Sequence, residues 1–130
     1  MTAAQVNAMS ALALAHAGDA VFELLVRTQL CTDGHSSRNN SLHRRTIARV
    51  CARAQARLAD RLTPLLTEAE AGYYRRGRNA HVHSAPKNAS HVDYAQATGL
   101  EALFGALYLR GEQARLRELF DAITEEDYAI

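Results

Sequence analysis

The sequence predicts an all-helical fold made of one domain that spans residues 1–130. Residues that favour helices, chiefly alanine, leucine, arginine and glutamate, dominate the chain, while β-branched residues are sparse. No stretch sustains the alternation of apolar and polar residues that is typical of strands. With 130 residues, of which 48% are hydrophobic, the chain is long enough for one compact core and too short for tandem modules.

The first half of the chain predicts a buried helix followed by amphipathic ones. Residues 9–30 are apolar on nearly every side, which predicts a buried helix that bends at Gly18. A turn over residues 32–34 ends it, and the polar stretch 36–41 offers N-cap residues for the next helix. Over residues 42–66, apolar residues recur every three or four positions, which predicts one or two amphipathic helices with arginine on the outer face. The predicted apolar positions are Ile47, Val50, Cys51, Ala54, Leu58 and Leu62.

Capping sequences predict the starts of two helices in the second half of the chain. Residues 67–70 form a capping box that opens a short helix, and this helix is expected to end where Gly77 takes the left-handed conformation. After a loop, residues 90–93 repeat the cap spacing and open a long helix over residues 92–110. A last amphipathic helix over residues 113–123 closes the core. Its predicted core residues are Leu116, Leu119, Phe120 and Ile123.

A net charge of +1 hides a basic middle segment. Residues 1–37 carry a charge of −2, residues 38–87 carry +8 and residues 88–130 carry −5. Arginine supplies fourteen of the fifteen basic residues, which suits phosphate binding because the guanidinium group is planar and permanently charged. The pattern favours a phosphate-bearing partner, and a general compositional bias is the alternative explanation of the arginine content.

We expect a cytoplasmic protein with no membrane partner. No run approaches the roughly 20 apolar residues that a membrane helix needs, and the N-terminus lacks the pattern of a signal peptide. Only two cysteines occur, Cys31 and Cys51, so a disulfide framework is not indicated.

Two of the predicted helices are too apolar for the carboxylates that they carry. Glu101 is the only charged residue in the stretch 100–109, and Asp19 and Glu23 are the only acids in the stretch 11–26. An unpaired buried carboxylate is strongly unfavourable, so each of these acids must reach a cation, hydrogen-bond donors or water. If Asp19 and Glu101 converge, they form an all-oxygen site that suits a hard divalent ion such as Mg²⁺, and Glu23 could orient a metal-bound water. The alternative is structural, with Asp19 capping a helix and Glu101 pairing with an arginine of the middle segment.

A second cluster predicts contacts with nucleic acid. Residues 73–79 (Tyr-Tyr-Arg-Arg-Gly-Arg-Asn) gather hydrogen-bond donors and two stacking rings near a helix end. Arginine side chains at such a place grip phosphates without reading base sequence. The alternative is an ordinary solvated surface. The residues that we expect to bind RNA are Arg75, Arg76, Arg78, Asn79, Lys87 and Asn88.

Several stretches of the sequence resemble one family. Residues 14–23 (LAHAGDAVFE) resemble the signature helix of ribonuclease III domains, and residues 98–109 (TGLEALFGALYL) resemble their second acidic helix. Residues 76–80 (RGRNA) and 86–88 (PKN) look like those of the short branch called Mini-ribonuclease III, which lacks the double-stranded-RNA-binding domain. The resemblance covers nearly the whole chain.

The resemblance implies a ribonuclease III-type helical domain that acts as a homodimeric, Mg²⁺-dependent endonuclease on double-stranded RNA and matures a large-subunit ribosomal RNA precursor. It implies that Asp19 and Glu101 are catalytic and hold the metal. Ala15 and Thr98 stand where larger enzymes of the family carry two more acids, and Mini-ribonuclease III shares this reduced set. The alternative function is a non-catalytic RNA-binding or ribosome-associated scaffold, and the presence of both Asp19 and Glu101 argues against it.

The apolar helix over residues 9–30 also predicts a dimer contact. It is apolar on more faces than one small core can cover, and surplus apolar surface on a soluble chain marks an interface. In the family that the sequence resembles, a bulky aromatic residue three positions before the signature aspartate packs into the partner. His16 holds that position here. We therefore expect His16 at a two-fold interface.

Overall fold

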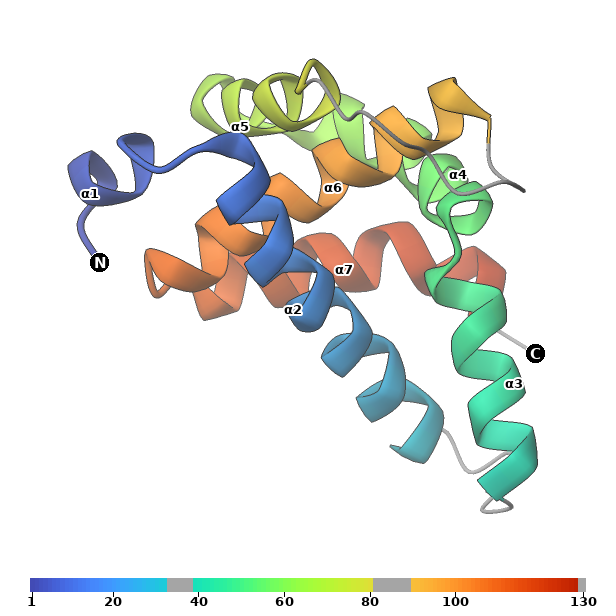
Figure 1. Ribbon diagram of the computed structural model, residues 1–130. Helices are drawn as coiled ribbons and strands as arrows, with labels where there is room; N and C mark the ends of the chain where they lie inside the picture. Colours follow the sequence, from blue (N-terminus) through green and yellow to red (C-terminus); the bar gives the residue numbers. More distant parts are fainter. Residues whose placement is uncertain (33–38, 81–89, 129–130) are drawn as a thin grey trace.

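The computed structural model describes residues 1–32, 39–80 and 90–128, and every regular element within these ranges is a helix (Figure 1). The predicted all-helical class is confirmed. In the same part of the chain no helix is long and apolar enough to cross a membrane. The helices are α1 (Ala3–Asn7), α2 (Ala11–Thr32), α3 (Asn39–Val50), α4 (Ala52–Leu62), α5 (Glu68–Arg78), α6 (His91–Leu109) and α7 (Gln113–Tyr128), and a single 3-10 turn, η1 (Thr63–Leu65), follows α4.

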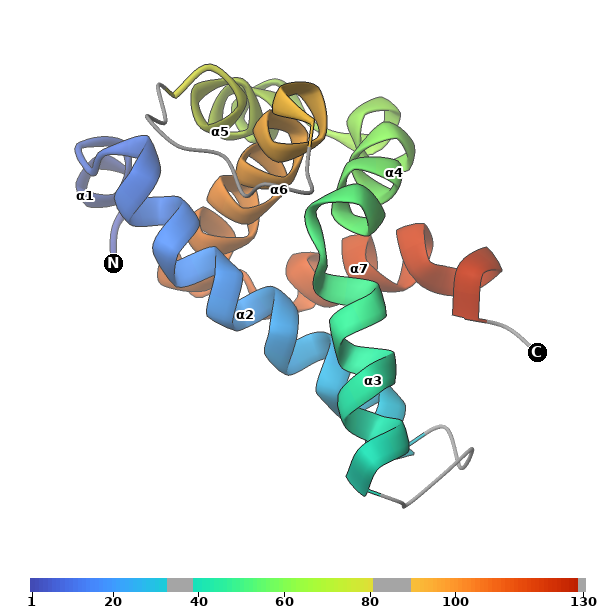
Figure 2. The same ribbon diagram turned by 45° about the vertical axis from the view of Figure 1, so that its right-hand side comes forward.

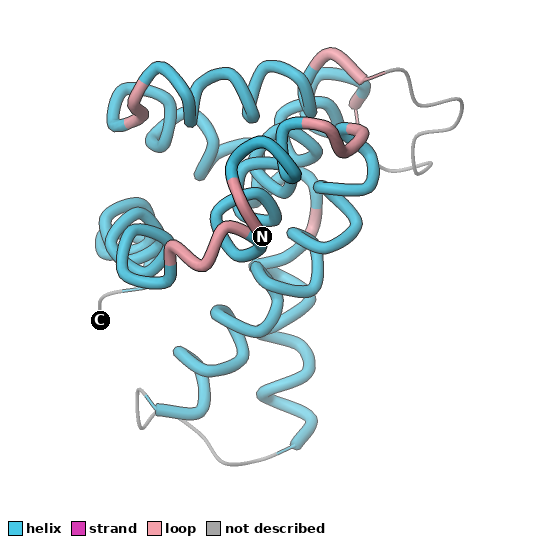
Figure 3. Tube along the Cα trace, turned by 90° about the vertical axis from the view of Figure 1, so that its left-hand side faces the viewer, coloured by secondary structure: helices cyan, strands magenta, loops and turns pink. Residues whose placement is uncertain are grey.

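Helix α6 is the central element, and it packs against α2, α4, α5 and α7. Figures 1 and 2 show α5 on one side of α6 and α2 on the other, while α3 packs along the second half of α2. Figure 3 shows the same arrangement from the side of the N-terminus. The centre of the core is an aromatic cluster in which the ring of Phe22 lies 5.9 Å from those of Phe104 and Phe120. These rings join α2, α6 and α7.

Two glycines allow α2 and α6 to cross at close range. A Cβ atom on Gly18 would lie 1.6 Å from the carbonyl oxygen of Glu101, and one on Gly105 would lie 2.0 Å from the carbonyl oxygen of Leu14. No side chain fits at either position, because the backbones of the two helices touch there. Helix α2 continues through Gly18 to Thr32, so this glycine serves close helix packing and does not end a helical segment.

The predicted left-handed helix end at Gly77 is wrong. Helix α5 continues to Arg78, and Gly77 is a buried residue inside it. A Cβ on Gly77 would lie 2.7 Å from the carbonyl oxygen of Thr98, so this glycine also permits close packing on α6. Among the glycines in the described ranges, only Gly111 has a positive φ, of 76°, and it follows the end of α6.

The middle segment forms two helices, α3 and α4, that are interrupted at Cys51. Cys51 adopts an extended conformation, with φ −67° and ψ 156°, and serves as the N-cap of α4. This extended residue resets the helical phase, so the predicted apolar stripe is confirmed only in part on the α3 side, where Val50 packs against the core. Ile47 is 52% exposed and Cys51 is exposed, while Thr46 is buried. In α4 the predicted positions are buried as expected, namely Ala54, Leu58 and Leu62.

Most of the predicted helix starts and core positions of the remaining segments are confirmed. Thr67 and Glu70 form the capping box of α5, and the Ser90 side chain accepts a hydrogen bond from the Asp93 N–H at the start of α6. Helix α7 extends beyond the predicted end. The predictions did not include α1, although Thr2 and Gln5 form a capping box there too. The four predicted core residues of α7 are buried, namely Leu116, Leu119, Phe120 and Ile123.

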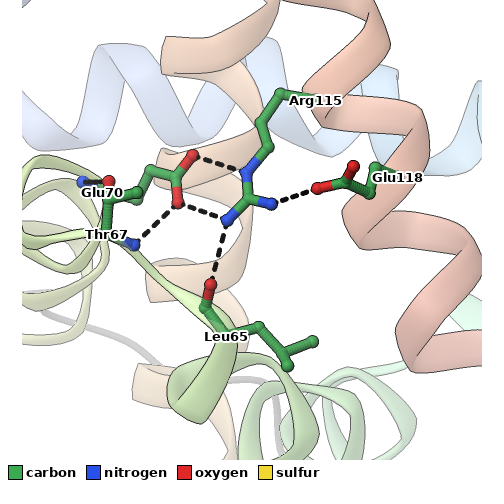
Figure 4. Close-up of polar contacts among 5 residues, drawn as sticks. All are labelled: Leu65, Thr67, Glu70, Arg115 and Glu118. Atoms are coloured by element: carbon green, nitrogen blue, oxygen red, sulfur yellow. Dashed lines mark hydrogen bonds and ion pairs between the residues drawn. The ribbon is translucent and has the colours of Figure 1, made fainter.

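A buried ion pair joins α5 to α7 (Figure 4). Glu70 is 5% exposed, and its two carboxylate oxygens accept hydrogen bonds of 2.9 Å from Nε and Nη2 of Arg115. The same guanidinium group donates to the carbonyl oxygen of Leu65 at 2.9 Å and to the carboxylate of Glu118. The hydrogen bonds from Arg115 lower the pKa of Glu70, and they outweigh the opposite effect of burial. The pair therefore favours the folded state whenever Glu70 is ionised.

Glu70→Gln is expected to lower the free energy of unfolding at neutral pH by about 2 kcal/mol, the usual contribution of hydrogen bonds to a charged group. Because the folded-state pKa of Glu70 lies below its usual value of 4.5, the stabilisation is present above pH 4.5 and is lost as the pH falls further. Urea unfolding of both proteins at neutral and acidic pH measures this difference. The control is Glu68→Gln, whose exposed carboxylate should contribute little. An undiminished difference at low pH would contradict the assignment.

Candidate active site

The crossing of α2 and α6 brings Asp19 and Glu101 together. Asp19 directly follows Gly18, whose backbone touches the carbonyl group of Glu101. The pKa of Glu101 is raised to about 8, first by burial and then by the charge of Asp19 and a hydrogen bond between the two side chains. Asp19 is exposed, so this pair of carboxyl groups, called here the acidic pair, is accessible from solvent on one side. The two carboxylates that the sequence singled out are direct neighbours.

Gln55 of α4 is part of this site, and sequence reasoning missed it. Its side chain is 2% exposed, and its Nε2 group donates a hydrogen bond of 2.9 Å to the carbonyl oxygen of Val50. A hydrogen bond from Gln55 to Glu101 lowers the pKa of Glu101 and so opposes the effects of burial and of Asp19. The sequence did hold one sign that Gln55 is buried. Ala59 and Leu62 follow it at helical spacing, so this polar residue lies in an apolar stripe.

The two positions where the resemblance implies further acids in larger enzymes are uncharged and buried in this chain. Thr98 is 5% exposed, and its hydroxyl group donates a hydrogen bond of 2.9 Å to the carbonyl oxygen of Tyr94. Ala15 is 7% exposed and packs in the core. Over residues 1–32, 39–80 and 90–128, no cluster of three or more histidine, cysteine, aspartate or glutamate side chains is placed to hold a metal. Within these ranges, no third such side chain therefore joins the acidic pair in a metal-binding cluster.

Glu23, which was expected to orient water at the site, forms an ion pair along its own helix. Its carboxylate lies 3.0 Å from Nε of Arg27, one turn further along α2. Both side chains are about half exposed, at 41% and 55%. Their interaction is a surface pair between residues four positions apart, so a role of Glu23 at the acidic pair stays a prediction.

The arginines at the end of α5 already have contacts within the chain. Arg75 lies 3.5 Å from Glu68, and Arg76 donates to the carbonyl oxygen of Met9 in the link between α1 and α2. Arg78 stacks over the ring of Tyr74, with its guanidinium carbon 5.8 Å from the ring centre. These charges also complement the negative end of the α5 dipole. Of the other predicted RNA-binding residues, Asn79 is the C-cap of α5, and Lys87 and Asn88 lie outside the described residues.

Helix α2 exposes an apolar stripe on the side that faces away from the core. Leu12 is 48% exposed and Leu24 is 62% exposed, and between them His16 and Ala20 are also exposed. These four residues follow one another at intervals of four, so they lie along one face of the helix. We call them the α2 stripe. His16 therefore lies on a surface that suits a helical partner.

The donor chemistry of the site suits a hard divalent cation. It consists of two carboxyl groups, and oxygen ligands of this kind are those that Mg²⁺ prefers. The charge of Asp19 raises the pKa of Glu101, and a cation between the two carboxyl groups would offset that repulsion. A site of this composition can support phosphodiester chemistry.

Comparison with known families identifies the family of this chain. The model of the family described as "Ribonuclease III domain" matches residues 12–112. The chain therefore belongs to the ribonuclease III family, and it is an endoribonuclease.

The relatives place the chain in the short branch of that family. The Mini-ribonuclease 3 of Symbiobacterium thermophilum is 47% identical over 114 residues, which are 88% of this chain and 87% of the relative. That of Synechocystis sp. is 44% identical over 124 residues, which are 95% of this chain and 84% of the relative. The structure is similar to the crystal structure of a protein from Fusobacterium nucleatum, with a TM-score of 0.81, 26% identity and coverage of 92% and 95% of the two chains. The resemblance to Mini-ribonuclease III is confirmed.

Proposed function

We propose that this endoribonuclease cleaves double-stranded RNA with Mg²⁺ at the acidic pair, and that it matures a large-subunit ribosomal RNA precursor. The observation that carries the proposal is the proximity of Asp19 and Glu101, two of the acids on the most apolar helices, α2 and α6. The Mini-ribonuclease 3 relatives support an RNA substrate.

In the proposed reaction, the two acids of the site would hold the cation that cleavage needs. A divalent cation supplies Lewis acidity for hydrolysis of a phosphodiester bond. Asp19, which is exposed, and Glu101, which is partly buried, would hold that cation between the solvent and the core. The rigid crossing of α2 and α6 fixes both carboxyl groups before the RNA arrives, which reduces the reorganisation needed for reaction.

The direct test is a cleavage assay with the purified protein. The substrates are a perfect RNA duplex, a single strand of the same sequence and a structured ribosomal RNA precursor, each with and without Mg²⁺. We expect cleavage of the duplex and of defined positions in the precursor only when Mg²⁺ is present. Cleavage of the single strand alone, or equal cleavage in a chelator, would contradict the proposal.

The basic middle segment would supply the affinity for the RNA backbone. A-form duplexes are recognised by shape, phosphates and 2′-hydroxyl groups more than by sequence. Residues 38–87 carry a charge of +8, and the exposed arginines of α4 and α5 belong to this segment. Phosphate contacts of this kind release counterions, so binding should weaken steeply with salt.

Arg78→Ala is expected to weaken duplex binding and to make the slope of log Kd against log salt shallower by about 1, because one phosphate contact is lost. Arg78 is the better residue to replace, because Arg76 also donates a hydrogen bond to the link between α1 and α2 and its loss could disturb the fold there. Binding is measured in an Asp19→Asn background to prevent cleavage. Arg117→Ala on α7, where Arg117 pairs with Asp121, is the control that should leave the slope unchanged. Equal slopes for both variants would place Arg78 off the RNA path.

The α2 stripe is proposed as the centre of a two-fold dimer. Two copies of one helix face are self-complementary across a two-fold axis. Such a dimer would place two acidic pairs on one assembly, one for each strand of a duplex. A stable interface of this kind buries roughly 800 Å² per subunit.

Leu24→Glu is expected to convert the dimer to a monomer at micromolar concentration, because it places a charge in the α2 stripe. Sedimentation velocity at neutral pH measures the change. The control is Val92→Glu, since Val92 is an equally exposed apolar residue, at 67%, at the start of α6. A wild-type protein that sediments as a monomer would rule out the dimer.

A further inference from the structure

A pocket of about 550 Å³ lies between α1, α5 and the end of α6. Its volume is in the range that is usual for sites of small organic ligands. Arg110, the C-cap of α6, lines the pocket and follows Glu101 by nine residues, so the two backbones are roughly 13 Å apart at the helical rise of about 1.5 Å per residue. Neither acid of the acidic pair lines the pocket. It is therefore a separate candidate site.

Small residues keep the pocket open on the side of α5. Ala69 and Gly72 of α5 and Ala3 of α1 line it. A Cβ atom on Gly72 would meet no atom within 4 Å, which shows independently that open space covers this part of α5. The neighbouring Tyr73 also lines the pocket and is only 5% exposed. These surfaces are largely apolar, so they favour a ligand with an apolar body.

Two arginines give the pocket a positive charge that no acid in its lining offsets. Arg76 and Arg110 line the pocket, and none of the other lining residues is acidic. Within the described chain, Arg76 donates to the carbonyl oxygen of Met9 and pairs with no carboxylate. Arg110 lies 3.6 Å from the carboxylate of Glu112, which is longer than a hydrogen bond. Because a guanidinium group has five N–H donors, both arginines keep donors for an anion.

The uncharged polar groups of the pocket are oriented by a bond to each other. The hydroxyl group of Tyr73 donates a hydrogen bond to Oδ1 of Asn7. This bond fixes the amide and leaves its Nδ2 group without an acceptor among the described residues. A sugar with many hydroxyl groups would find few partners here. A nucleobase has apolar faces and acceptor atoms at its edge, so it suits the small residues and the free amide hydrogens.

We propose that this pocket binds a nucleoside monophosphate, with the phosphate on Arg76 and Arg110 and the base on the small residues of α1 and α5. A phosphate monoester carries about two negative charges at neutral pH, which match the two guanidinium groups. Arginine binds such a group through paired N–H donors. The site needs no metal and lies apart from the acidic pair, so it is a second function, beyond the proposed cleavage of RNA.

Isothermal titration calorimetry with guanosine 5′-monophosphate (GMP) measures binding, and a chelator keeps metal from the acidic pair. We expect saturable binding at one site per chain. Guanosine and ribose 5-phosphate each lack one part of the ligand, so each should bind about 10-fold more weakly or worse. The absence of saturable binding at millimolar GMP would overturn the proposal. Equal affinity for GMP and ribose 5-phosphate would overturn it as well.

Gly72→Leu is the variant that fills the pocket, and Gly72→Ala is its matched control. Both replace a glycine inside α5 with a residue that favours helices more, so both should fold. The leucine side chain would occupy the space of the base and should weaken GMP binding by about 10-fold or more. The single methyl group of alanine has room and should leave the affinity close to that of wild type. Wild-type affinity in Gly72→Leu would place GMP elsewhere and overturn the proposal.

Arg110→Gln tests the phosphate contact separately from the shape of the pocket. We expect the affinity for GMP to fall by about 10- to 100-fold, because a charged hydrogen-bonding partner is lost, while the affinity for guanosine stays unchanged. An equal loss for both ligands would contradict a phosphate contact at Arg110. Asp19→Asn should bind GMP as wild type does, so failure of the proposed metal site leaves this result intact. Loss of GMP binding in Asp19→Asn would place the nucleotide at the acidic pair and overturn the proposal.

The same chemical group occurs in a free nucleotide and at the 5′ end of an RNA strand. A short single strand that begins with 5′-phosphorylated guanosine is therefore compared with the same strand bearing a 5′-hydroxyl group. A preference for the phosphorylated strand that disappears in Gly72→Leu identifies the RNA end as the source of the ligand. Equal binding of the two strands, together with GMP binding that is lost in Gly72→Leu, identifies the free nucleotide. If Gly72→Leu changes the binding of neither GMP nor the phosphorylated strand, the proposal is overturned.

Discussion

Asp19→Asn and Glu101→Gln are each expected to reduce the rate of duplex cleavage by a factor of about 1,000 or more, because a catalytic metal ion contributes several kcal/mol to lowering the barrier and about 1.4 kcal/mol corresponds to a factor of ten. The acidic pair offers no described third carboxylate to replace the one lost. Initial rates at saturating Mg²⁺ measure the effect. Rates close to wild type in either variant would remove the acidic pair from catalysis.

The same variants should remain folded. Each substitution removes one of two neighbouring carboxyl groups, and the partly buried one, Glu101, has a pKa raised to about 8 by burial and by Asp19. Loss of that unfavourable proximity should leave the melting temperature of the metal-free protein equal to wild type or higher. Glu23→Gln is the companion variant, and it should reduce cleavage less, because Glu23 pairs with Arg27.

Gly105→Ala and Gly18→Ala are expected to destabilise the fold by about 3 kcal/mol or more each, at the upper end of the usual cost of overpacking. The added methyl group would meet backbone atoms at 2.0 Å and 1.6 Å, and backbone cannot rotate aside as a side chain can. Urea unfolding measures the loss. Helices α2 and α6 would have to move apart, so any folded fraction should also cleave more slowly.

Gly72→Ala is the control for this prediction. Gly72 lies inside α5, and a Cβ there would meet no atom within 4 Å. Alanine is more favourable than glycine in a helix by about 1 kcal/mol, so this variant should gain stability. A similar loss in all three variants would show that glycine is needed for a reason other than the crossing.

The sequence predicts the acidic pair because its signal is local. Asp19 and Glu101 each stand out as a charge within one apolar helix, and the cost of burying a lone carboxylate directs attention to both. The capping box at Thr67 and Glu70 is local in the same sense, since both halves lie within four residues. Helix starts and these two acids are therefore predictable from the amino-acid sequence alone.

The features that sequence reasoning missed depend on contacts between distant residues. Gly77 fits a helix end and a close helix contact equally well, and only the position of α6 decides between them. The Glu70–Arg115 pair joins residues 45 positions apart. No periodicity within one helix indicates such partners. The phase change at Cys51 has a different cause, because one extended residue between two helices leaves little trace in composition.

The glycine crossing of α2 and α6 has a consequence for the evolution and engineering of this enzyme. The separation of the backbones that carry Asp19 and Glu101 is set by touching main chains, so it is inherited with the architecture and does not depend on the other core side chains. Sequence drift elsewhere in the core can change the melting temperature without altering that separation, whereas a change at Gly18 or Gly105 alters both at once. Directed evolution toward new RNA substrates should therefore leave these two glycines fixed and vary the exposed ends of α4 and α5.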